Sequence, residues 1–212
     1  MSDEVKTPNG RAARTEARVV SAATALFLER GYQGTTLADV AAAAGVGART
    51  VYVRFGTKAA LLRRAIDVAL VGDTLPIDVA HRDWSVTAMT APTLHERVAA
   101  QASGGRALME RVGPLLAVAG QAEPVEAEIA AAAQAGREET VRQVRAFWAA
   151  LGRDGLLHPG ADSDWAGATT ALLATADTYL LITRTLRWTP AEYETWIYRT
   201  WMHLATTPGP PP

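Results

Sequence analysis

The chain has 212 residues, a net charge of −1 at pH 7 and no cysteine. This length allows one or two domains, and the 49% hydrophobic and 20% charged residues are typical of a globular protein. Without cysteine, disulfides, thiolate metal sites and a cysteine nucleophile are excluded. No apolar run approaches the ~20 residues that span a bilayer. The N-terminus lacks the apolar core of a signal peptide, so we expect a cytoplasmic protein.

The charge is distributed unevenly along the chain. Residues 1–64 carry ten Lys and Arg against five Asp and Glu, a balance of +5, whereas residues 65–212 carry eleven against seventeen, a balance of −6. A small basic part followed by a larger acidic part indicates that the first part meets a polyanion.

Helical periodicity runs through the chain, and we expect an all-α fold. In the N-terminal part the expected helices cover about 11–30, 37–44, 48–55 and 57–72. Thr36 and Asp39 have nearly the spacing of a capping box at the start of the second helix. Residues 72–91 are expected to be mostly irregular, with a short helix at WSVTAM.

The C-terminal part predicts three longer helices at about 92–120, 124–151 and 163–187, and a last helix at 190–206. Gly104–Gly105 and Gly113–Pro114 are expected to bend the first of them. Thr189 followed by proline and Glu192 is a near-ideal start for the last helix.

The stretch TLADVAAAAGVGARTVYVRFGTK, residues 36–58, predicts a helix-turn-helix, because two short helices are joined by a glycine turn. Small residues at 41, 44 and 45 allow the helices to approach closely. The outward face of the second helix carries Ala48, Arg49, Tyr52 and Val53. Such a face suits the major groove of DNA. Arg54 and Lys58 follow near its end, where we expect phosphate contacts.

The segment TTLADVAAAAGVGARTVYVRFGTKAALL, with ALFLERGYQGTT before it, resembles the DNA-binding segment of TetR-type (tetracycline-repressor-like) bacterial regulators. The shared pattern is a Thr-capped helix, AGV, a small residue, a variable pair, then Thr, an aliphatic residue, Tyr, Phe and Lys at fixed spacing. The resemblance covers residues 15–64, and RWTPAEYETWIYRT resembles the last helix of many members. It implies an N-terminal three-helix DNA-binding domain and a larger C-terminal helical domain for ligand binding and dimerisation.

The resemblance also implies which residues contact DNA. It implies that phosphates are contacted by Thr36, Tyr52, Arg54 and Lys58. It implies that bases are faced by Ala48, Arg49 and Val53, and that Thr50 makes a further contact with DNA. Gly47 stands where serine often caps the recognition helix. Because Ala38 and Ala48 offer no hydrogen bonds, direct base readout is expected to depend largely on Arg49.

The sequence offers little for catalysis. His81, His95, His158 and His203 lack metal-ligand spacing, and GxSxG, P-loop and GxGxxG motifs are absent. We therefore expect no metal, no cofactor and no enzyme. A small helical enzyme is the distant alternative, and turnover of a small molecule would distinguish it.

An effector pocket in the C-terminal domain follows mainly from the resemblance, with a small apolar or aromatic ligand. The candidate lining residues are Trp84, Met109, Phe147, Trp148, Trp165 and Tyr179. For each of them an ordinary helical core is an equally good interpretation.

The last two expected helices are apolar on more than one side, which indicates a partner outside their own core. We expect an isologous four-helix bundle between two copies of the chain. The expected interface residues are Trp165, Leu172, Leu173, Leu180, Trp196, Tyr198, Trp201 and Met202.

The expected organisation is a disordered tail at 1–10, a DNA-binding domain at 11–72 with the helix-turn-helix at 36–55, an effector-binding and dimerisation domain at 73–206, and a disordered tail at 207–212. The expected function is that of a dimeric transcriptional regulator, a repressor that a small effector releases from a palindromic operator. The alternatives are an activator and an architectural DNA binder without an effector.

Overall fold

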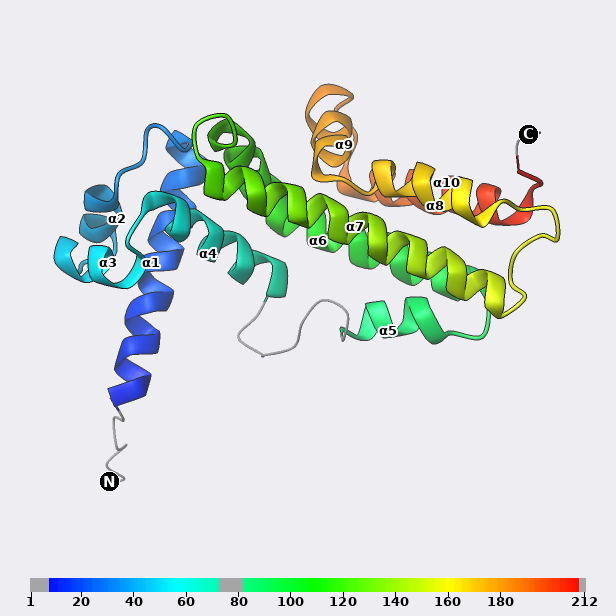
Figure 1. Cartoon of the computed structure of the whole chain (residues 1–212), viewed down its shortest axis with the longest axis horizontal. Helices are drawn as coiled ribbons and strands as arrows, with labels where there is room; N and C mark the ends of the chain where they lie inside the picture. Colours follow the sequence, from blue (N-terminus) through cyan, green and yellow to red (C-terminus); the bar gives the residue numbers. More distant parts are fainter. Residues whose placement is uncertain (1–7, 73–81, 210–212) are drawn as a thin grey trace. The chain divides into compact units, whose positions relative to one another are not determined.

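The computed structural model describes residues 8–72 and 82–209, and within them the regular structure is helical, with no strand (Figure 1). The chain divides into two compact units. The first comprises Met1–Val68 and Leu115–Ala132, and the second comprises Ala69–Pro114 and Ala133–Pro212. The all-α expectation is confirmed.

The first unit contains four helices from the N-terminal part of the chain: α1 (Pro8–Arg30), α2 (Leu37–Ala43), α3 (Ala48–Phe55) and most of α4 (Lys58–Val71). Helix α1 begins before the expected Arg11, so residues 8–10 are helical and do not belong to a disordered tail. A proline is compatible with the first turn, because the N–H that it lacks would have no helical partner there. The rest of that expected tail, residues 1–7, lies outside the described residues.

The expected capping box of α2 is present. The Thr36 hydroxyl oxygen accepts a hydrogen bond from the Asp39 backbone N–H at 3.1 Å, and the Asp39 carboxylate accepts from the Thr36 N–H at 3.2 Å. These bonds satisfy backbone donors that the helix itself cannot. Thr36 accordingly fixes where α2 begins.

The first unit has a core to which a later segment also contributes. Its buried side chains include Val19, Ala23, Phe27, Val40, Val51, Leu61, Leu62, Leu115 and Ile129. Tyr32 attaches the later segment, because its hydroxyl donates to Glu126 at 2.7 Å and its backbone N–H donates to the Gln121 side chain at 3.2 Å. The expected DNA-binding domain, residues 11–72, therefore covers only part of this unit, because Leu115–Ala132 also belongs to it.

The remaining helices are α5 (Asp83–Thr90), α6 (Leu94–Ala122), α7 (Ala127–Arg153), α8 (Ser163–Leu173), α9 (Ala176–Leu180), the π-helix Leu181–Thr185 and α10 (Pro190–Thr206). Helix α6 is continuous through Gly104, Gly105 and Pro114. Helix α7 starts at Ala127, later than the expected Pro124, because Val125 and Glu126 donate their backbone N–H groups to Ala122 in a turn.

The expected continuous helix over 163–187 is broken. Helix α8 ends at Leu173, and Thr175 caps α9 by accepting a hydrogen bond from the Thr178 N–H at 3.3 Å. A threonine hydroxyl that bonds local backbone in this way competes with continuation of the helix. After the π-helix, Arg187 has a φ of 62° and reverses the chain before α10.

The core of the second unit is aromatic. The rings of Phe147 and Trp201 lie 5.4 Å apart, and those of Trp148 and Trp201 lie 6.1 Å apart. All three side chains are fully buried, and the Trp148 indole N–H donates to Thr170 at 2.7 Å. The hydrogen bond satisfies a polar group that burial would otherwise penalise.

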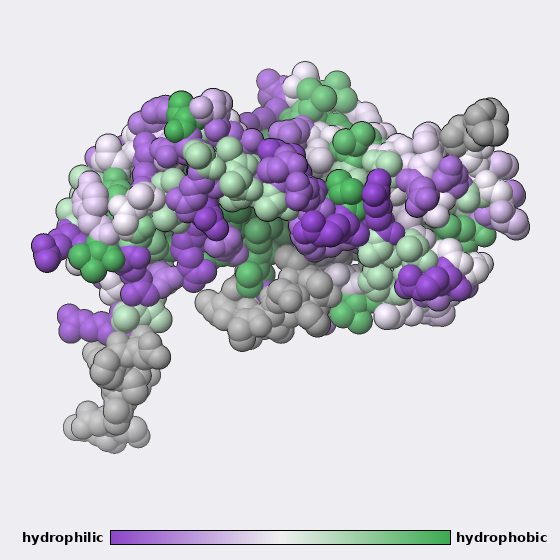
Figure 2. All heavy atoms as spheres, viewed as in Figure 1, coloured by the Kyte–Doolittle hydropathy of each residue, from purple (hydrophilic) through white to green (hydrophobic). Residues whose placement is uncertain are grey.

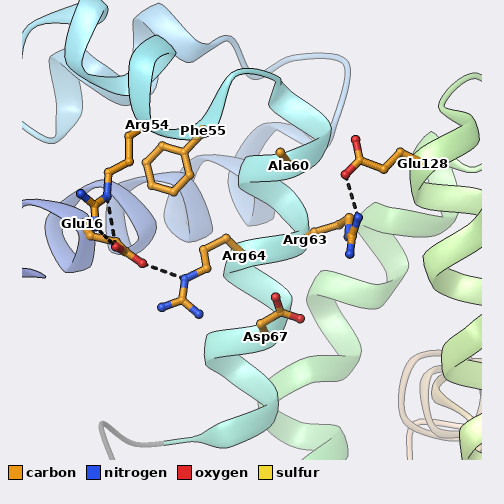
Figure 3. A pocket seen from close by; sticks show the side chains of 8 residues that line it. All are labelled: Glu16, Arg54, Phe55, Ala60, Arg63, Arg64, Asp67 and Glu128. Carbon is orange, nitrogen blue, oxygen red and sulfur yellow. Dashed lines mark hydrogen bonds and ion pairs between the residues drawn. The ribbon is translucent and has the colours of Figure 1, made fainter.

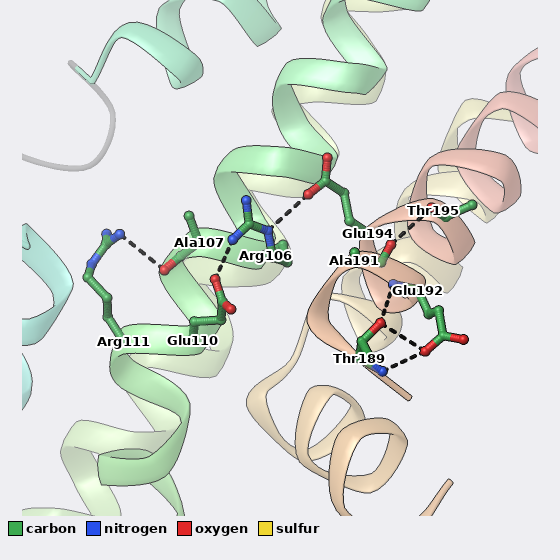
Figure 4. A network of polar contacts seen from close by, with 9 residues as sticks. All are labelled: Arg106, Ala107, Glu110, Arg111, Thr189, Ala191, Glu192, Glu194 and Thr195. Atoms are coloured by element: carbon green, nitrogen blue, oxygen red, sulfur yellow. Dashed lines mark hydrogen bonds and ion pairs between the residues drawn. The ribbon is translucent and has the colours of Figure 1, made fainter. Parts of the chain in front are cut away.

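Charged groups join α6 to α10 within the second unit. Arg106 donates to Glu194 at 2.9 Å and also pairs with Glu110 one turn along its own helix (Figure 4). These two carboxylates raise the pKa of the Arg106 guanidinium above its ordinary value. In the same view, Thr189 and Glu192 form the capping box that the sequence predicts at the start of α10.

The segment after α10 is partly ordered. The backbone N–H of Thr207 donates to His203 at 3.1 Å, and that of Gly209 donates to Gly160 at 2.8 Å. Residues 207–209 are therefore held by hydrogen bonds and are not a disordered tail, while 210–212 lie outside the described residues.

Candidate DNA-binding site

The helix-turn-helix is formed by α2, a glycine turn and α3. Gly45 has a φ of 62°, a conformation that favours glycine, and it carries the chain out of α2. Val40, Ala41 and Val51 are buried between the two helices and α1. Arg18 of α1 donates to the carbonyl oxygens of Ala44 and, at 3.3 Å, of Gly45. The turn is therefore held by packing on one side and by a guanidinium from α1.

The outward face of α3 carries the residues expected to meet DNA bases. Ala48 and Arg49 are exposed, Tyr52 is 53% exposed and Val53 is 76% exposed. Among the described residues, Arg49 makes no hydrogen bond or ion pair, so its guanidinium fork is available for the bidentate contact that arginine makes with guanine. Val53 and the Tyr52 ring are apolar surface that can contact a thymine methyl group.

Two threonines were also expected at the DNA. The Thr36 hydroxyl is exposed but bonded to the Asp39 carboxylate at 2.6 Å. Thr50 is exposed in the first turn of α3, where its backbone N–H donates to Gly47 at 2.9 Å. Both hydroxyls are accessible to a phosphate, and that of Thr36 has a competing partner.

Arg54 is engaged inside the unit. Its Nε donates to the Glu16 carboxylate at 3.0 Å, and Arg64 of α4 donates to the other carboxylate oxygen at 2.8 Å (Figure 3). The Arg54 guanidinium, followed by that of Arg64, holds the pKa of the Glu16 carboxyl below its usual value against the opposing effect of burial. Glu16 was not among the expected site residues, because no pattern near it in the sequence indicates that it contacts α3 and α4.

Lys58 is also engaged. Its ammonium group donates to the carbonyl oxygen of Tyr32 at 2.7 Å and lies over the ring of the same residue. The side chain is half-buried, in contrast to the exposed Arg49. The structure thus gives Lys58 an internal role beside the phosphate contact that the sequence predicts.

A charged hollow lies beside these arginines in the first unit. It is lined by Glu16, Arg54, Phe55, Ala60, Arg63, Arg64, Asp67 and Glu128 (Figure 3). Arg63 donates to Glu128 at 2.7 Å across it, which joins α4 to the start of α7. Three arginines and three carboxylates make this an unsuitable place for an apolar effector.

The six residues expected to line an effector pocket are distributed between the core and the surface of the second unit. Phe147 and Trp148 are closed into the core, whereas Trp165 is 43% exposed. Tyr179 is buried against the ring of Tyr193, at a centroid distance of 5.0 Å. Met109 packs against the edge of the same core, and Trp84 of α5 lies on α6 at Gly104.

The expected dimer residues also separate. Trp201 is 1% exposed and is therefore not available to a second copy, whereas Tyr198 is partly exposed and its hydroxyl lies 2.7 Å from Nδ1 of His95. The intramolecular core covers the first, and α6 provides a partner for the second. Leu173, Leu180, Trp196 and Met202 are partly buried against the core.

Several large apolar side chains of the second unit are exposed. Leu172 is 69% exposed, and Trp165 lies on the same helix. Leu181 and Leu186, which were not among the expected interface residues, are 58% and 55% exposed, and Figure 2 shows hydrophobic residues at the surface over α9. We refer to Trp165, Leu172, Leu181 and Leu186 as the apolar face.

A metal site and a membrane span each have recognisable structural features. Within residues 8–72 and 82–209, no three His, Asp or Glu side chains are grouped as they would be around a metal ion. None of the helices described there has the length and apolar character needed to cross a membrane.

The family model of bacterial regulatory proteins of the tetR family matches residues 19–65. No curated protein matches the sequence significantly. Among solved structures, the chain is similar to a protein described as a TetR-family transcriptional regulator of Mesorhizobium loti, at 22% identity and a TM-score of 0.68 over 92% of this chain and 96% of that one.

Two further structures are similar over comparable lengths. One is NalD, the secondary repressor of the MexAB-OprM multidrug efflux pump of Pseudomonas aeruginosa, at 21% identity, a TM-score of 0.63 and coverage of 90% and 96%. The other is PfmR of Thermus thermophilus, at 21% identity, a TM-score of 0.60 and coverage of 95% and 97%. At these identities the structural likeness establishes the fold.

Proposed function

Because residues 19–65 match the family model of bacterial regulatory proteins of the tetR family, we propose that the chain is a member of this family and a repressor that a small effector releases from its operator. The observation that carries DNA recognition is the outward face of α3, where Arg49, Tyr52 and Val53 are exposed. Repression is supported by analogy with NalD, which has the same fold. The protein acts by stoichiometric binding and turns over no substrate.

We propose that the operator is palindromic and that a dimer binds it. Two recognition helices then lie about 34–36 Å apart, one turn of DNA, in successive major grooves. The apolar face supplies the surface for the second copy, since its four large apolar side chains, on α8 and at the π-helix, are 43–69% exposed, and exposed apolar patches mark interaction sites. A cytoplasmic location follows from this function.

Release requires that the effector change the separation of the recognition helices. Helices α6 and α7 each contribute residues to both units, and their shared segment Leu115–Ala132 is bonded to Tyr32 of the first unit. A shift of either helix, or of α4, in response to an effector would therefore reach the DNA-binding unit through continuous backbone. The proposed effector is apolar or aromatic, in keeping with the aromatic character of the second unit.

Selection of bound duplexes from a random DNA pool tests whether the protein recognises a palindromic operator. We expect a recurring palindrome with half-sites one turn apart, and recovery of unrelated sequences would contradict the proposal. Compounds from an apolar library can then be tested for release of that duplex. All six tryptophans lie in the second unit, so an effector should change the intrinsic fluorescence and raise the melting temperature, while DNA alone should change fluorescence little.

A further inference from the structure

We propose that Glu16 is a positioning residue for operator binding, which fixes the recognition helix α3 by holding Arg54 and Arg64 on one carboxylate. This inference rests on the proposed function, because it concerns binding to the operator. Glu16 carries a negative charge and cannot itself contact a phosphate favourably. Any contribution that it makes to affinity must act through the arginines that it holds.

The geometry places Glu16 at the junction of three helices. It comes from α1, Arg54 comes from the last turn of α3, and Arg64 comes from α4. Each carboxylate oxygen accepts from a different guanidinium, at 3.0 Å from Arg54 Nε and 2.8 Å from Arg64 Nε (Figure 3). The Glu16 side chain is 22% exposed, so the pairs are partly shielded from solvent and from salt.

The hold on Arg54 matters because α3 has few other attachments. It has only eight residues, and Val51 is its one fully buried side chain. Gly47 provides no side-chain cap at its start. Before the start of α3, Arg18 bonds the turn that joins it to α2, so α1 holds both this turn and the end of α3. Loss of one hold leaves α3 free to change its angle in the groove.

The test is Glu16→Gln, with Glu29→Gln as the matched control. Glu29 lies on the same helix, its side chain is 67% exposed, and among the described residues it forms an ion pair only with the adjacent Arg30. Both variants replace a glutamate by glutamine and therefore change the net charge equally. The probes are the palindromic duplex selected by the wild-type protein and a random duplex of equal length. We expect Glu16→Gln to bind the selected duplex roughly three- to tenfold more weakly. Binding to the random duplex and the salt slope should match those of Glu29→Gln.

Two outcomes would overturn the proposal. If Glu16→Gln bound both duplexes more tightly, with a salt slope steeper by about 0.9 for each freed guanidinium, Glu16 would mask phosphate-binding arginines and not position α3. If Glu16→Gln and Glu29→Gln bound the selected duplex equally, Glu16 would have no role in recognition. Failure of the wild-type protein to select any sequence would instead contradict the proposed function.

A double-mutant cycle tests whether Glu16 acts through Arg54. Arg54→Gln and Glu16→Gln should each weaken binding to the selected duplex, and the double variant should be no weaker than Arg54→Gln alone. Additive losses, with a salt slope lowered by about 0.9 in Arg54→Gln, would show that Arg54 contacts a phosphate independently of Glu16 and would overturn the proposal. Thermal unfolding of each variant establishes that the DNA-binding unit is folded at the assay temperature.

Discussion

The ammonium nitrogen of Lys58 lies 2.7 Å from the carbonyl oxygen of Tyr32 and 4.1 Å from the centroid of the Tyr32 ring. This contact joins the first residue of α4 to the loop that follows α1. The hydroxyl of the same tyrosine donates to Glu126, and burial, followed by the neighbouring Glu126 carboxylate, raises the pKa of that hydroxyl. Lys58, Tyr32 and Glu126 are therefore joined by successive contacts that stabilise the first unit.

Replacement of Lys58 by methionine keeps most of its aliphatic stem and removes the ammonium group. We expect the free energy of unfolding to fall by about 1–2 kcal/mol, because a charge-assisted hydrogen bond and a cation–π contact are lost. Thermal unfolding measures this, with Arg30→Met as a control of equal charge. If operator binding also lost about 0.9 of its salt slope relative to the control, Lys58 would contact a phosphate as the sequence predicts.

Arg49→Lys tests base recognition. Lysine keeps the charge but lacks the planar fork that contacts guanine at two points. We expect the preference at one operator position to weaken by roughly 1–3 kcal/mol, while affinity for random DNA and the salt slope stay the same. Binding to a set of singly substituted duplexes measures the preference at each position. An unchanged preference at every position would remove Arg49 from the base-reading face.

Two adjacent glycines of α6 provide a matched pair. A methyl group on Gly104 would lie 2.1 Å from Cδ2 of Trp84, whereas nothing lies within 4 Å of the same atom on Gly105. We expect Gly104→Ala to displace the indole and destabilise the protein by about 1–3 kcal/mol. Gly105→Ala should stabilise it by up to ~1 kcal/mol, because alanine favours a helix. Equal melting temperatures for the two variants would contradict the observed position of the Trp84 ring against Gly104.

The apolar face can be tested by charge. Wild-type protein should scatter light as a particle of about twice the 22.5 kDa chain mass. Leu172→Glu places a carboxylate on a side chain that is 69% exposed, so the monomer should fold while the dimer and operator affinity are lost. Val86→Glu, at an exposed apolar position of α5, is the control and should remain dimeric. A dimeric Leu172→Glu variant would place the interface elsewhere.

Local features of the sequence predicted much of the helical framework. Thr36 with Asp39, and Thr189 with Glu192, form capping boxes that start two helices, and each depends on residues only three positions apart. The helix-turn-helix could also be predicted from the sequence, because its glycine turn and its buried and exposed faces lie within about twenty residues. The outward face of α3 follows from helical periodicity once its buried face is known.

The same reasoning was wrong where a helix depends on competing bonds or an unexpected neighbour. The break after Leu173 depends on the Thr175 hydroxyl, which could equally have faced solvent in a continuous helix. The apolar pattern of α10 could not distinguish a side chain that meets a second copy from one that meets the intramolecular core. Trp201 therefore seemed available to a partner, although it packs against Phe147 and Trp148.

The sequence by itself determined most of the helical framework, the outward face of α3 and the resemblance of residues 15–64 to TetR-type regulators, because these depend on residues close together along the chain. Only the tertiary structure decided which charged side chains of the helix-turn-helix are paired within the protein and which are unpaired. Arg54 bonds a residue 38 positions away and Lys58 one 26 positions away, whereas Arg49 has no partner among the described residues. Helical periodicity places a side chain on a face, but its partner across helices is fixed only when the chain folds, because that partner lies far away in sequence.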